Sequence, residues 1–373
     1  MTNFKNNKQA LEFLNLVNKK KFQKIIIVTG KNSLYKSEGD KLISLIHKNK
    51  NINFFFKKSK FPEINELKKL VLFIEKLKPD LIIAIGGGAV IDYSKIANIV
   101  DIKNFETLEK KITKYITPGS KKRSILIAIP TTAGSGAEAT SNAVIYIDKI
   151  KYSVESQLLL PDYFFLINQL IFKNPTKLKS SSGFDAIAQS IESLLSLKSN
   201  SKSVIFAKKS LILTNKNYLS FVKKPTNLNS NNMLIAANLS GKAINISKTT
   251  APHAVSYPFT SIYGINHGHA VSLTLEKFLM FNFRNMHLSK SEFSLKNRYK
   301  ILFDLFKVQN ISDLCIKIKK IKKEANLVDD FKKLGVNLDK NIDRILDGIN
   351  LLRVKNNPVQ INEKDIKEIL YKI

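Results

Sequence analysis

The sequence predicts two domains, an α/β domain over residues 1–173 and an all-α domain over residues 174–373. The chain has 373 residues, more than one typical domain holds, and 44% of them are hydrophobic, which suffices for a core in each half. Short β-branched or aromatic runs alternate with amphipathic stretches in the first half, whereas long helical patterns fill the second. Pro175 favours a boundary here because proline cannot extend a preceding helix.

Five candidate strands occur in the first half, and their alternation with helical patterns predicts a largely parallel sheet covered on both faces. They are Lys24–Val28, Asn53–Phe56, Leu81–Ile85, Ser124–Ile129 and Asn142–Ile147. Glu63–Lys78 has apolar residues at three- and four-residue intervals, which is typical of an amphipathic helix. In the second half we expect helices over Gly183–Leu197, Val204–Leu213, Asn231–Ser247 and much of the chain from Lys290 onward.

The net charge of +31, from 61 basic and 30 acidic side chains, raises the alternative of a nucleic-acid-binding protein. The lysines are dispersed through the elements and lack an aromatic-interleaved binding motif, so solvated helix faces explain them better. A positive surface would also steer small anionic substrates and cofactors inward. The charge is therefore compatible with an enzyme of anionic substrates without being evidence for one.

The segment Met1–Lys5 has no apolar core followed by small residues, so we expect no signal peptide. No apolar run approaches the ~20 residues that a transmembrane helix requires. The single cysteine, Cys315, excludes an internal disulfide framework. These observations predict a cytoplasmic protein without a membrane partner.

A glycine turn follows the third candidate strand, because Leu81–Ile85 runs directly into Gly86, Gly87 and Gly88 and then into a helical pattern. Glycines let backbone N–H groups approach an anion, and a new helix presents its positive end there. The spacing differs from G-x-G-x-x-G, and a tight turn is the alternative. A second polar loop follows the fourth strand, and the two together suit a dinucleotide across strand ends. The cofactor-binding candidates in these segments are Gly86, Gly87, Gly88, Asp92, Thr131, Thr132 and Ser135.

A metal-binding constellation is predicted in the second half. Asp185 and Gln189 are four residues apart and lie on one helix face. His253 and His267 follow in a short segment that holds three of the chain's five histidines. One carboxylate, one amide oxygen and two imidazoles can bind a divalent transition metal and leave a position open for substrate. Singly, such an Asp is more often a helix cap, and such a His a hydrogen-bonded structural residue.

Three segments, Gly86–Lys95, Pro130–Thr140 and His253–Asn282, together resemble the iron-containing alcohol dehydrogenases, whose fold is shared with glycerol dehydrogenase and dehydroquinate synthase. The motifs are long and stand in the right order within residues 1–285. The resemblance implies a dinucleotide-binding amino-terminal domain, a helical metal-binding domain and a metal at the cleft. It also implies NADPH or NADH as cofactor, Fe²⁺ with Zn²⁺ as the alternative, and a homodimer.

The resemblance also implies roles for individual residues. Asp185, His253 and His267 match three ligand positions of the family, while Gln189 stands where most members have His. An amide oxygen is a harder and weaker ligand than imidazole, which leaves the identity of the metal open. Tyr257 replaces a second family His, and the proton relay is expected to involve Tyr257 or His269.

Cofactor preference is expected from the residues after the first strand. Many NAD-preferring relatives have an Asp there, which binds the ribose hydroxyls, whereas this chain has Gly30. Without that carboxylate a 2′-phosphate is not repelled, and Lys31 or Ser33 could contact it. The sequence therefore favours NADPH, with NADH as the alternative.

The run Gly241–His253 resembles the phosphonoacetaldehyde reductase branch of the family, as does the Asp185…Gln189 pattern. Asn245, Thr249 and His253 recur every four residues, and we expect them to lie on one helix that points the first two toward whatever the metal holds. We expect Pro252 to bend or end that helix. The phosphonate-binding candidates are Lys242, Asn245, Lys248 and Thr249. The predicted reaction is reduction of phosphonoacetaldehyde to 2-hydroxyethylphosphonate, with a small-alcohol or polyol dehydrogenase as the alternative and a nucleic-acid-binding protein as the third.

Overall fold

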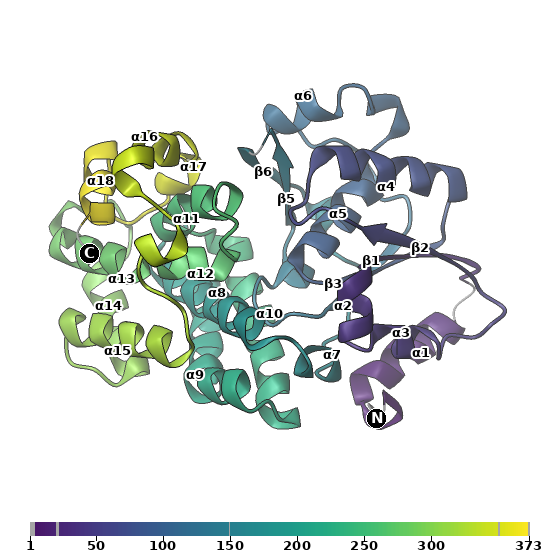
Figure 1. Cartoon of the computed structure of the whole chain (residues 1–373), viewed down its shortest axis with the longest axis horizontal. Coiled ribbons are helices and arrows are strands. Elements are labelled where there is room, and N and C mark those ends of the chain that lie inside the picture. Colours follow the sequence, from purple (N-terminus) through teal and green to yellow (C-terminus); the bar gives the residue numbers. More distant parts are fainter. Residues whose placement is uncertain (1–3, 20–21, 149, 350, 372–373) are drawn as a thin grey trace. The chain divides into compact units, whose positions relative to one another are not determined.

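The computed structural model describes residues 4–19, 22–148, 150–349 and 351–371. The chain divides into two compact units, Met1–Asn174 and Pro175–Ile373, coloured purple to teal and teal to yellow in Figure 1. The predicted fold class, α/β followed by all-α, is confirmed. Among the described helices, none combines the length and the apolar content that crossing a bilayer would require.

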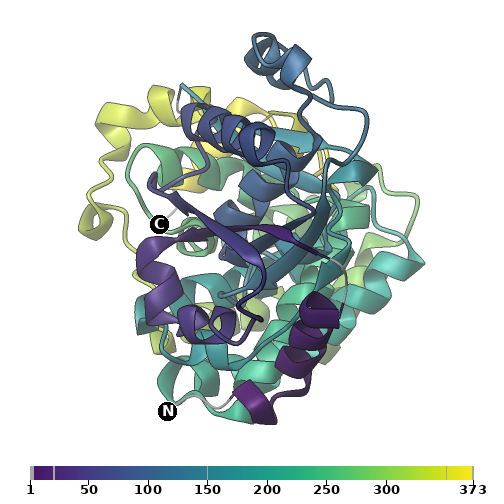
Figure 2. The same ribbon diagram turned by 90° about the vertical axis from the view of Figure 1, so that its right-hand side faces the viewer.

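The first unit is built on a five-stranded parallel sheet with the strand order β2-β1-β3-β4-β7. Figure 2 shows β1 and β2 running side by side, and their register pairs Lys24 with Asn51 through Gly30 with Lys57. The strands are β1 (Lys24–Gly30), β2 (Asn51–Lys57), β3 (Leu81–Gly86), β4 (Ile125–Pro130) and β7 (Tyr163–Phe164). All strands being parallel, their carboxyl ends meet at one edge of the sheet.

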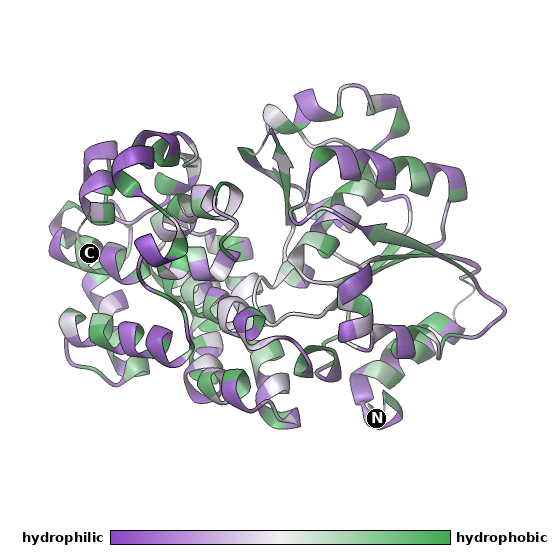
Figure 3. Cartoon of the chain, viewed as in Figure 1, coloured by the Kyte–Doolittle hydropathy of each residue, from purple (hydrophilic) through white to green (hydrophobic). Residues whose placement is uncertain are grey.

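Alternation along each strand gives the sheet two buried faces. Ile26 and Val28 pack with α4 and α5 on one face, whereas Ile25 and Ile27 pack with α1 and α3 on the other. In Figure 3 the outer helix α4 alternates hydrophobic and hydrophilic bands, as a half-buried helix must. The helices of this unit are α1 (Lys8–Lys19), α2 (Lys31–Lys36), α3 (Gly39–Ile43), α4 (Ile64–Leu77), α5 (Gly88–Ile99), α6 (Leu108–Thr113) and α7 (Gln169–Phe172).

Two strands lie outside the main sheet. The expected strand Asn142–Ile147 is present as β5, but it pairs antiparallel with β6 (Ile150–Glu155) in a separate two-stranded sheet. A short connection joins β5 to β6, and so short a connection allows only antiparallel pairing. The alternation of strands with helical patterns in the sequence would by itself have placed β5 in the parallel sheet.

The second unit is helical, and its centre is formed by α8, α9 and α10, which pack on one another. The helix expected from Gly183 begins earlier, at Thr176, directly after Pro175. Its helices are α8 (Thr176–Leu195), α9 (Ser201–Lys223), α10 (Asn227–Ser247), α11 (Ala251–Ser261), α12 (His267–Ser272), α13 (Leu275–Arg284), α14 (Leu295–Phe306), α15 (Ile311–Glu324), α16 (Leu338–Asp347), α17 (Leu351–Val354) and α18 (Glu363–Tyr371).

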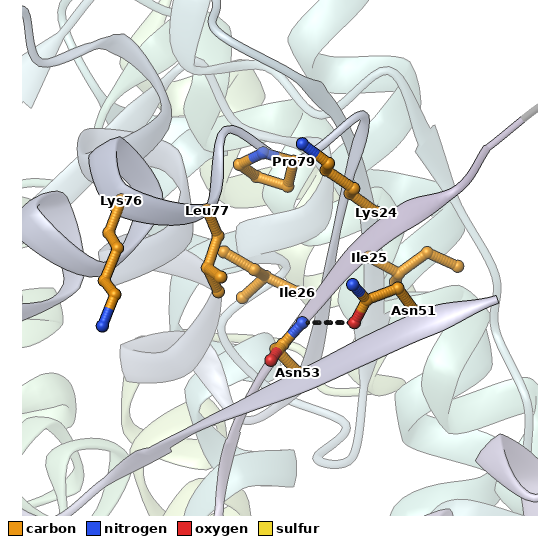
Figure 4. A pocket seen from close by; sticks show the side chains of 8 residues that line it. All are labelled: Lys24, Ile25, Ile26, Asn51, Asn53, Lys76, Leu77 and Pro79. Carbon is orange, nitrogen blue, oxygen red and sulfur yellow. Dashed lines mark hydrogen bonds between the residues drawn. The ribbon is translucent and has the colours of Figure 1, made fainter.

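A pocket in the first unit lies where β1 and β2 begin. Figure 4 shows Lys24, Lys76, Asn51 and Asn53 around it, with Asn53 donating a hydrogen bond of 2.9 Å to Asn51. Because it sits at the amino ends of parallel strands, it is at the opposite edge from the glycine turn. The expected dinucleotide loops therefore do not line it.

Candidate functional site

The two loops expected to hold the dinucleotide lie against each other at the carboxyl edge of the sheet. Gly86 pairs with Pro130 in the strand register, and Thr131 N donates to Gly86 O at 2.9 Å. A Cβ on Gly88 would lie 2.8 Å from Ser135 Oγ, and one on Gly87 would lie 3.5 Å from Thr132 Oγ1. The glycines therefore keep a narrow space beside the start of α5 that side chains would fill.

Gly30 ends β1 at the same edge, and the helix α2 begins at the next residue, Lys31. Ser33 is turned back onto the chain, since its Oγ donates to Gly30 O at 2.9 Å, while Lys31 is exposed. Strand β1 neighbours β3, so these residues belong to the same edge as the glycine turn.

Asp92, a cofactor-binding candidate, is engaged within the fold. Its Oδ2 accepts from Val144 N at 3.0 Å, and its Oδ1 lies 3.9 Å from Lys95 Nζ. Lys95 is fully buried and donates to Thr140 Oγ1 at 2.9 Å. Burial raises the pKa of Asp92 to about 6 and lowers the pKa of Lys95 to about 8. The pair ties α5 to β5 behind the glycine turn.

Three predicted ligands in the second unit converge. Ligand atoms of Asp185 on α8, His253 on α11 and His267 on α12 all lie within 4.8 Å of one another. Asp185 and His253 are buried, whereas His267 is partly exposed. A carboxylate and two imidazoles at this spacing suit a divalent transition metal, and the exposed side suits an open coordination position.

Gly268 makes this convergence feasible. A Cβ at this position would lie 2.0 Å from Ser181 O and 2.8 Å from Asp185 Cβ. Only glycine therefore lets α12 rest directly on α8, which brings the neighbouring His267 to Asp185.

Glu192 holds the ring of His253, a role that sequence reasoning missed. Its Oε2 is hydrogen-bonded to His253 Nδ1, and its Oε1 accepts from Thr250 N at 2.9 Å and from Thr250 Oγ1 at 3.0 Å. A carboxylate on the other ring nitrogen is the usual support of a metal-binding histidine. The available signal was spacing, because Glu192 stands seven residues after Asp185 and so shares its helix face.

His253 Nε2 lies 3.2 Å from Asp185 Oδ1. Burial alone would lower the pKa of His253, but Glu192 and Asp185 outweigh it and raise the pKa to about 9. The ring of His253 thus lies between two carboxylates, with Nδ1 on Glu192 and Nε2 on Asp185. A metal bound at Nε2 would replace a proton there, so metal binding should release a proton.

Gln189 belongs to the same cluster. Its Nε2 donates to Asp185 Oδ2 at 3.2 Å, and its Oε1 accepts from Ser240 Oγ at 2.9 Å. Asp185 and Gln189 therefore do share one face of α8. The amide carries its nitrogen toward Asp185 and its oxygen toward α10.

Two family models match nearly the whole chain. "Iron-containing alcohol dehydrogenase" matches residues 3–167, and "Fe-containing alcohol dehydrogenase family, C-terminal" matches residues 179–373. The chain belongs to the iron-containing alcohol dehydrogenase family. The resemblance inferred from three motifs is thereby confirmed.

Individual relatives within this family differ in how much they align. Phosphonoacetaldehyde reductase of Streptomyces viridochromogenes is 28% identical over 56% of this chain and 55% of that protein. NADPH-dependent butanol dehydrogenase of Clostridium saccharobutylicum is 24% identical over 83% of this chain and 80% of that protein. The alignments with the first few curated relatives span about half of their length or less.

Among solved structures, this chain is similar to sulfoacetaldehyde reductase from Bifidobacterium kashiwanohense in complex with NAD⁺. The TM-score is 0.83 at 25% identity, covering 98% of this chain and 94% of that one. An alcohol dehydrogenase from Oenococcus oeni gives a TM-score of 0.84 at 22% identity, which is a likeness of fold.

Tyr257, which replaces a histidine of the family, lies beside the cluster. Its ring stacks on His267 with centroids 6.1 Å apart, and its hydroxyl is hydrogen-bonded by Thr249. Burial raises the pKa of Tyr257, so the phenol keeps its proton at neutral pH. His269, the other relay candidate, points elsewhere, because its Nε2 is hydrogen-bonded to Val328 O at 2.7 Å.

The expected single helix through Asn245, Thr249 and His253 is wrong. Helix α10 ends at Ser247 and α11 begins at Ala251, so Thr249 lies in the connection between them. Pro252 lies in the first turn of α11 rather than at the end of a helix, because a first-turn residue needs no N–H partner and has the φ that proline favours. The Thr249 side chain nevertheless forms a hydrogen bond with Tyr257.

Lys248 has a backbone conformation that few side-chain-bearing residues adopt, with φ 59° and ψ 175°. Asn356 holds both flanking carbonyls, donating to Ser247 O at 2.9 Å and to Thr249 O at 2.8 Å. Ser196 Oγ also donates to Ser247 O, at 2.6 Å. Strain maintained by so many bonds beside a ligand cluster indicates a functional segment.

Arg353, on α17, is a further residue that sequence reasoning missed. Helix α17 packs against α11, and the positive charge of Arg353 acts on Tyr257. The helix is separated from α11 by about a quarter of the chain, and nothing in its local sequence indicates this position.

Proposed function

We propose that this protein is an oxidoreductase that converts a small anionic aldehyde and a reduced nicotinamide, with one proton, into the alcohol and the oxidised nicotinamide. The observation that carries the proposal is the convergence of Asp185, His253 and His267 within 4.8 Å. We assign cofactor binding to residues 1–173, and metal and substrate binding to residues 174–373.

The donor set fits a divalent cation, which we propose to be Fe²⁺, with Zn²⁺ as the alternative. Asp185, His253 and His267 would hold it together with Gln189, and Glu192 would orient His253. When bound, such an ion supplies Lewis acidity toward a carbonyl oxygen. The chain's own part is to fix the His253 ring so that Nδ1 bonds to Glu192 and Nε2 faces Asp185.

The glycine turn of the first unit would bind the pyrophosphate through backbone N–H groups at the start of α5. Ser135 and Thr132, which face Gly88 and Gly87, would add hydroxyl donors. Support comes from the similar sulfoacetaldehyde reductase, whose structure contains NAD⁺. Gly30 leaves the end of β1 without a carboxylate, which favours NADPH over NADH.

We assign the proton donor to Tyr257 Oη rather than to His269. Tyr257 stacks on His267 and keeps its phenolic proton, with Thr249 donating to its oxygen. The imidazole of His269 is occupied with Val328 O and fixes a loop instead.

For the substrate class we propose a short aldehyde carrying a phosphonate. Arg353 adds a cation next to Tyr257, and the strained Lys248 adds a second one beside Thr249. A dianionic headgroup needs such charge-assisted donors. Two relatives, phosphonoacetaldehyde reductase and sulfoacetaldehyde reductase, are named for aldehydes with an acidic headgroup. The butanol dehydrogenase relative favours an unspecialised alcohol dehydrogenase as the second candidate.

A substrate panel separates the two candidates. Phosphonoacetaldehyde, acetaldehyde and butanal are reduced by the purified protein with NADPH and with NADH. We expect phosphonoacetaldehyde to have a kcat/KM at least about tenfold higher, the effect of one charge-assisted contact. Equal values for the three aldehydes would reject the anionic substrate, and no reduction of any would reject the oxidoreductase.

The same substrate panel with an Arg353→Gln variant tests the proposed headgroup contact. Lys355→Gln is the matched control, because Lys355 is an exposed neighbouring cation. The Arg353 variant should raise KM for phosphonoacetaldehyde by about tenfold while leaving that for butanal unchanged. A uniform loss with every aldehyde would indicate a structural role for Arg353 and contradict the headgroup contact.

A further inference from the structure

Lys95 is a fully buried cation on α5, the helix that begins at Gly88. A buried charge is costly unless it is paired and hydrogen-bonded. The partners of Lys95 therefore indicate what this charge holds in place.

The partners of Lys95 include the end of the second proposed cofactor loop. Its Nζ donates to Thr140 Oγ1 at 2.9 Å and to Asn142 O at 3.0 Å. Glu138 is buried in the 3₁₀ turn Ala137–Ala139 of the same loop, and its negative charge partly offsets the effect of burial on the pKa of Lys95. Hydrogen bonds and charge therefore hold the end of this loop against α5.

A series of hydrogen bonds leads from Thr140 to Ser135. Thr140 Oγ1 lies 3.2 Å from Ala137 O and 3.3 Å from Asn142 O, and its one proton serves one of them at a time. Because Lys95 already donates to Asn142 O, we assign the Thr140 proton to Ala137 O. The N–H of Ala137 in turn donates to Ser135 Oγ at 3.4 Å. Lys95 is thus connected through the 3₁₀ turn to a hydroxyl beside the glycine turn.

The 3₁₀ turn also packs directly on the start of α5. A Cβ on Gly88 would lie 2.8 Å from Ser135 Oγ and 3.9 Å from Ala137 Cβ. A small displacement of the turn would therefore move the Ser135 hydroxyl relative to the backbone N–H groups that we propose to bind the pyrophosphate.

We infer that Lys95 is a positioning residue that holds Ser135 beside the glycine turn and thereby sets the affinity for the pyrophosphate of the cofactor. The inference rests on the proposed cofactor site. Lys95 acts through Thr140, whose hydroxyl accepts from Nζ and donates to the turn. A valine in place of Thr140 has nearly the same shape but can do neither.

The test measures the affinities of the full chain for NADPH and for ADP, which carries a pyrophosphate but no nicotinamide. Thr140→Val should weaken both by about five- to tenfold, the effect of one hydrogen bond, whereas Thr140→Ser keeps the hydroxyl and should bind close to wild type. Lys95→Met should weaken both ligands at least as much. Ser94→Ala is the matched control, since Ser94 is buried on α5 and its hydroxyl donates to Val90 O of the same helix.

A double-mutant cycle shows whether the effect passes through Ser135. In a Ser135→Ala background, Thr140→Val should change either affinity by no more than about twofold, because the group that it positions is gone. Equal losses in both backgrounds, or a loss confined to NADPH, would overturn the inference. Wild-type affinity in Thr140→Val, or in a Lys95→Met variant that folds, would overturn it as well. If the wild-type chain bound neither NADPH, NADH nor ADP, the proposed cofactor site would fail instead.

Discussion

The two proposed sites are built in opposite ways. The cofactor site of the first unit consists of backbone and small side chains from two loops, each contiguous in sequence, at Gly86–Gly88 and Thr131–Ser135. The metal site of the second unit consists of charged side chains from three helices, and Asp185 and His267 are 82 positions apart, as their numbers show. The first kind of site tolerates few added atoms, whereas the second depends on individual ligands. Variants in one unit should therefore leave the other unit's ligand bound.

The largest effect is expected from Asp185→Ala. Loss of the only carboxylate among the three converging ligands should abolish stoichiometric metal and lower activity by about a thousandfold or more. Elemental analysis and an aldehyde reduction assay measure the two effects, and His47→Ala, an exposed histidine, is the control. Cofactor affinity should be unchanged, and a parallel loss of both ligands would break the division between the units.

Glu192→Gln should have the next largest effect. The amide can still bond to His253 Nδ1 but carries no charge to increase the basicity of the metal-binding nitrogen, so metal affinity should fall about 10- to 100-fold. Competition titration with Zn²⁺ checks this. Full affinity in the variant would mean that Glu192 serves only the fold.

Gly88→Ala tests the proposed cofactor site of the first unit. The new Cβ would lie 2.8 Å from Ser135 Oγ, and the displacement should weaken cofactor binding by about tenfold. Tenfold corresponds to about 1.4 kcal/mol, within the roughly 1–3 kcal/mol that overpacking costs. Fluorescence titration with NADPH measures this, while metal content stays constant. Unchanged cofactor affinity in the variant would show that the cofactor does not bind against the backbone at Gly88.

The smallest effect is expected at Glu38, away from both loops. Hydrogen bonds from Lys41 at 2.5 Å and the Lys173 ion pair at 3.0 Å lower the pKa of Glu38 below 4.5. A carboxylate whose pKa is lowered in the folded state stabilises the fold above about pH 4.5. That stability is lost as the pH falls through the folded-state pKa. Glu38→Gln should remove less than about 1 kcal/mol at pH 7, and nothing once wild-type Glu38 is protonated. Urea unfolding of wild type and variant, at pH 7 and at a pH below the folded-state pKa of Glu38, checks the sign of the difference in unfolding free energy.

The sequence by itself determined the fold class, and it located the two loops that we propose to bind the cofactor. Buried runs such as Leu81–Ile85 encode a strand locally, and three glycines after a strand restrict what the backbone does next. The family was also accessible, because its motifs are contiguous segments. The residues of the first unit's site are therefore predictable from short windows of sequence.

Tertiary structure decided the rest. The connection at Lys248 breaks what looked like one continuous helix, because hydrogen bonds from the Asn356 side chain to backbone carbonyls outweigh the local periodicity. Ser240 and Arg353 come to the metal cluster only through helix packing, which no local pattern encodes. Residues of a type that binds metals can be recognised along a chain. The residues that orient them and set their electrostatic surroundings are determined by contacts between elements far apart in sequence.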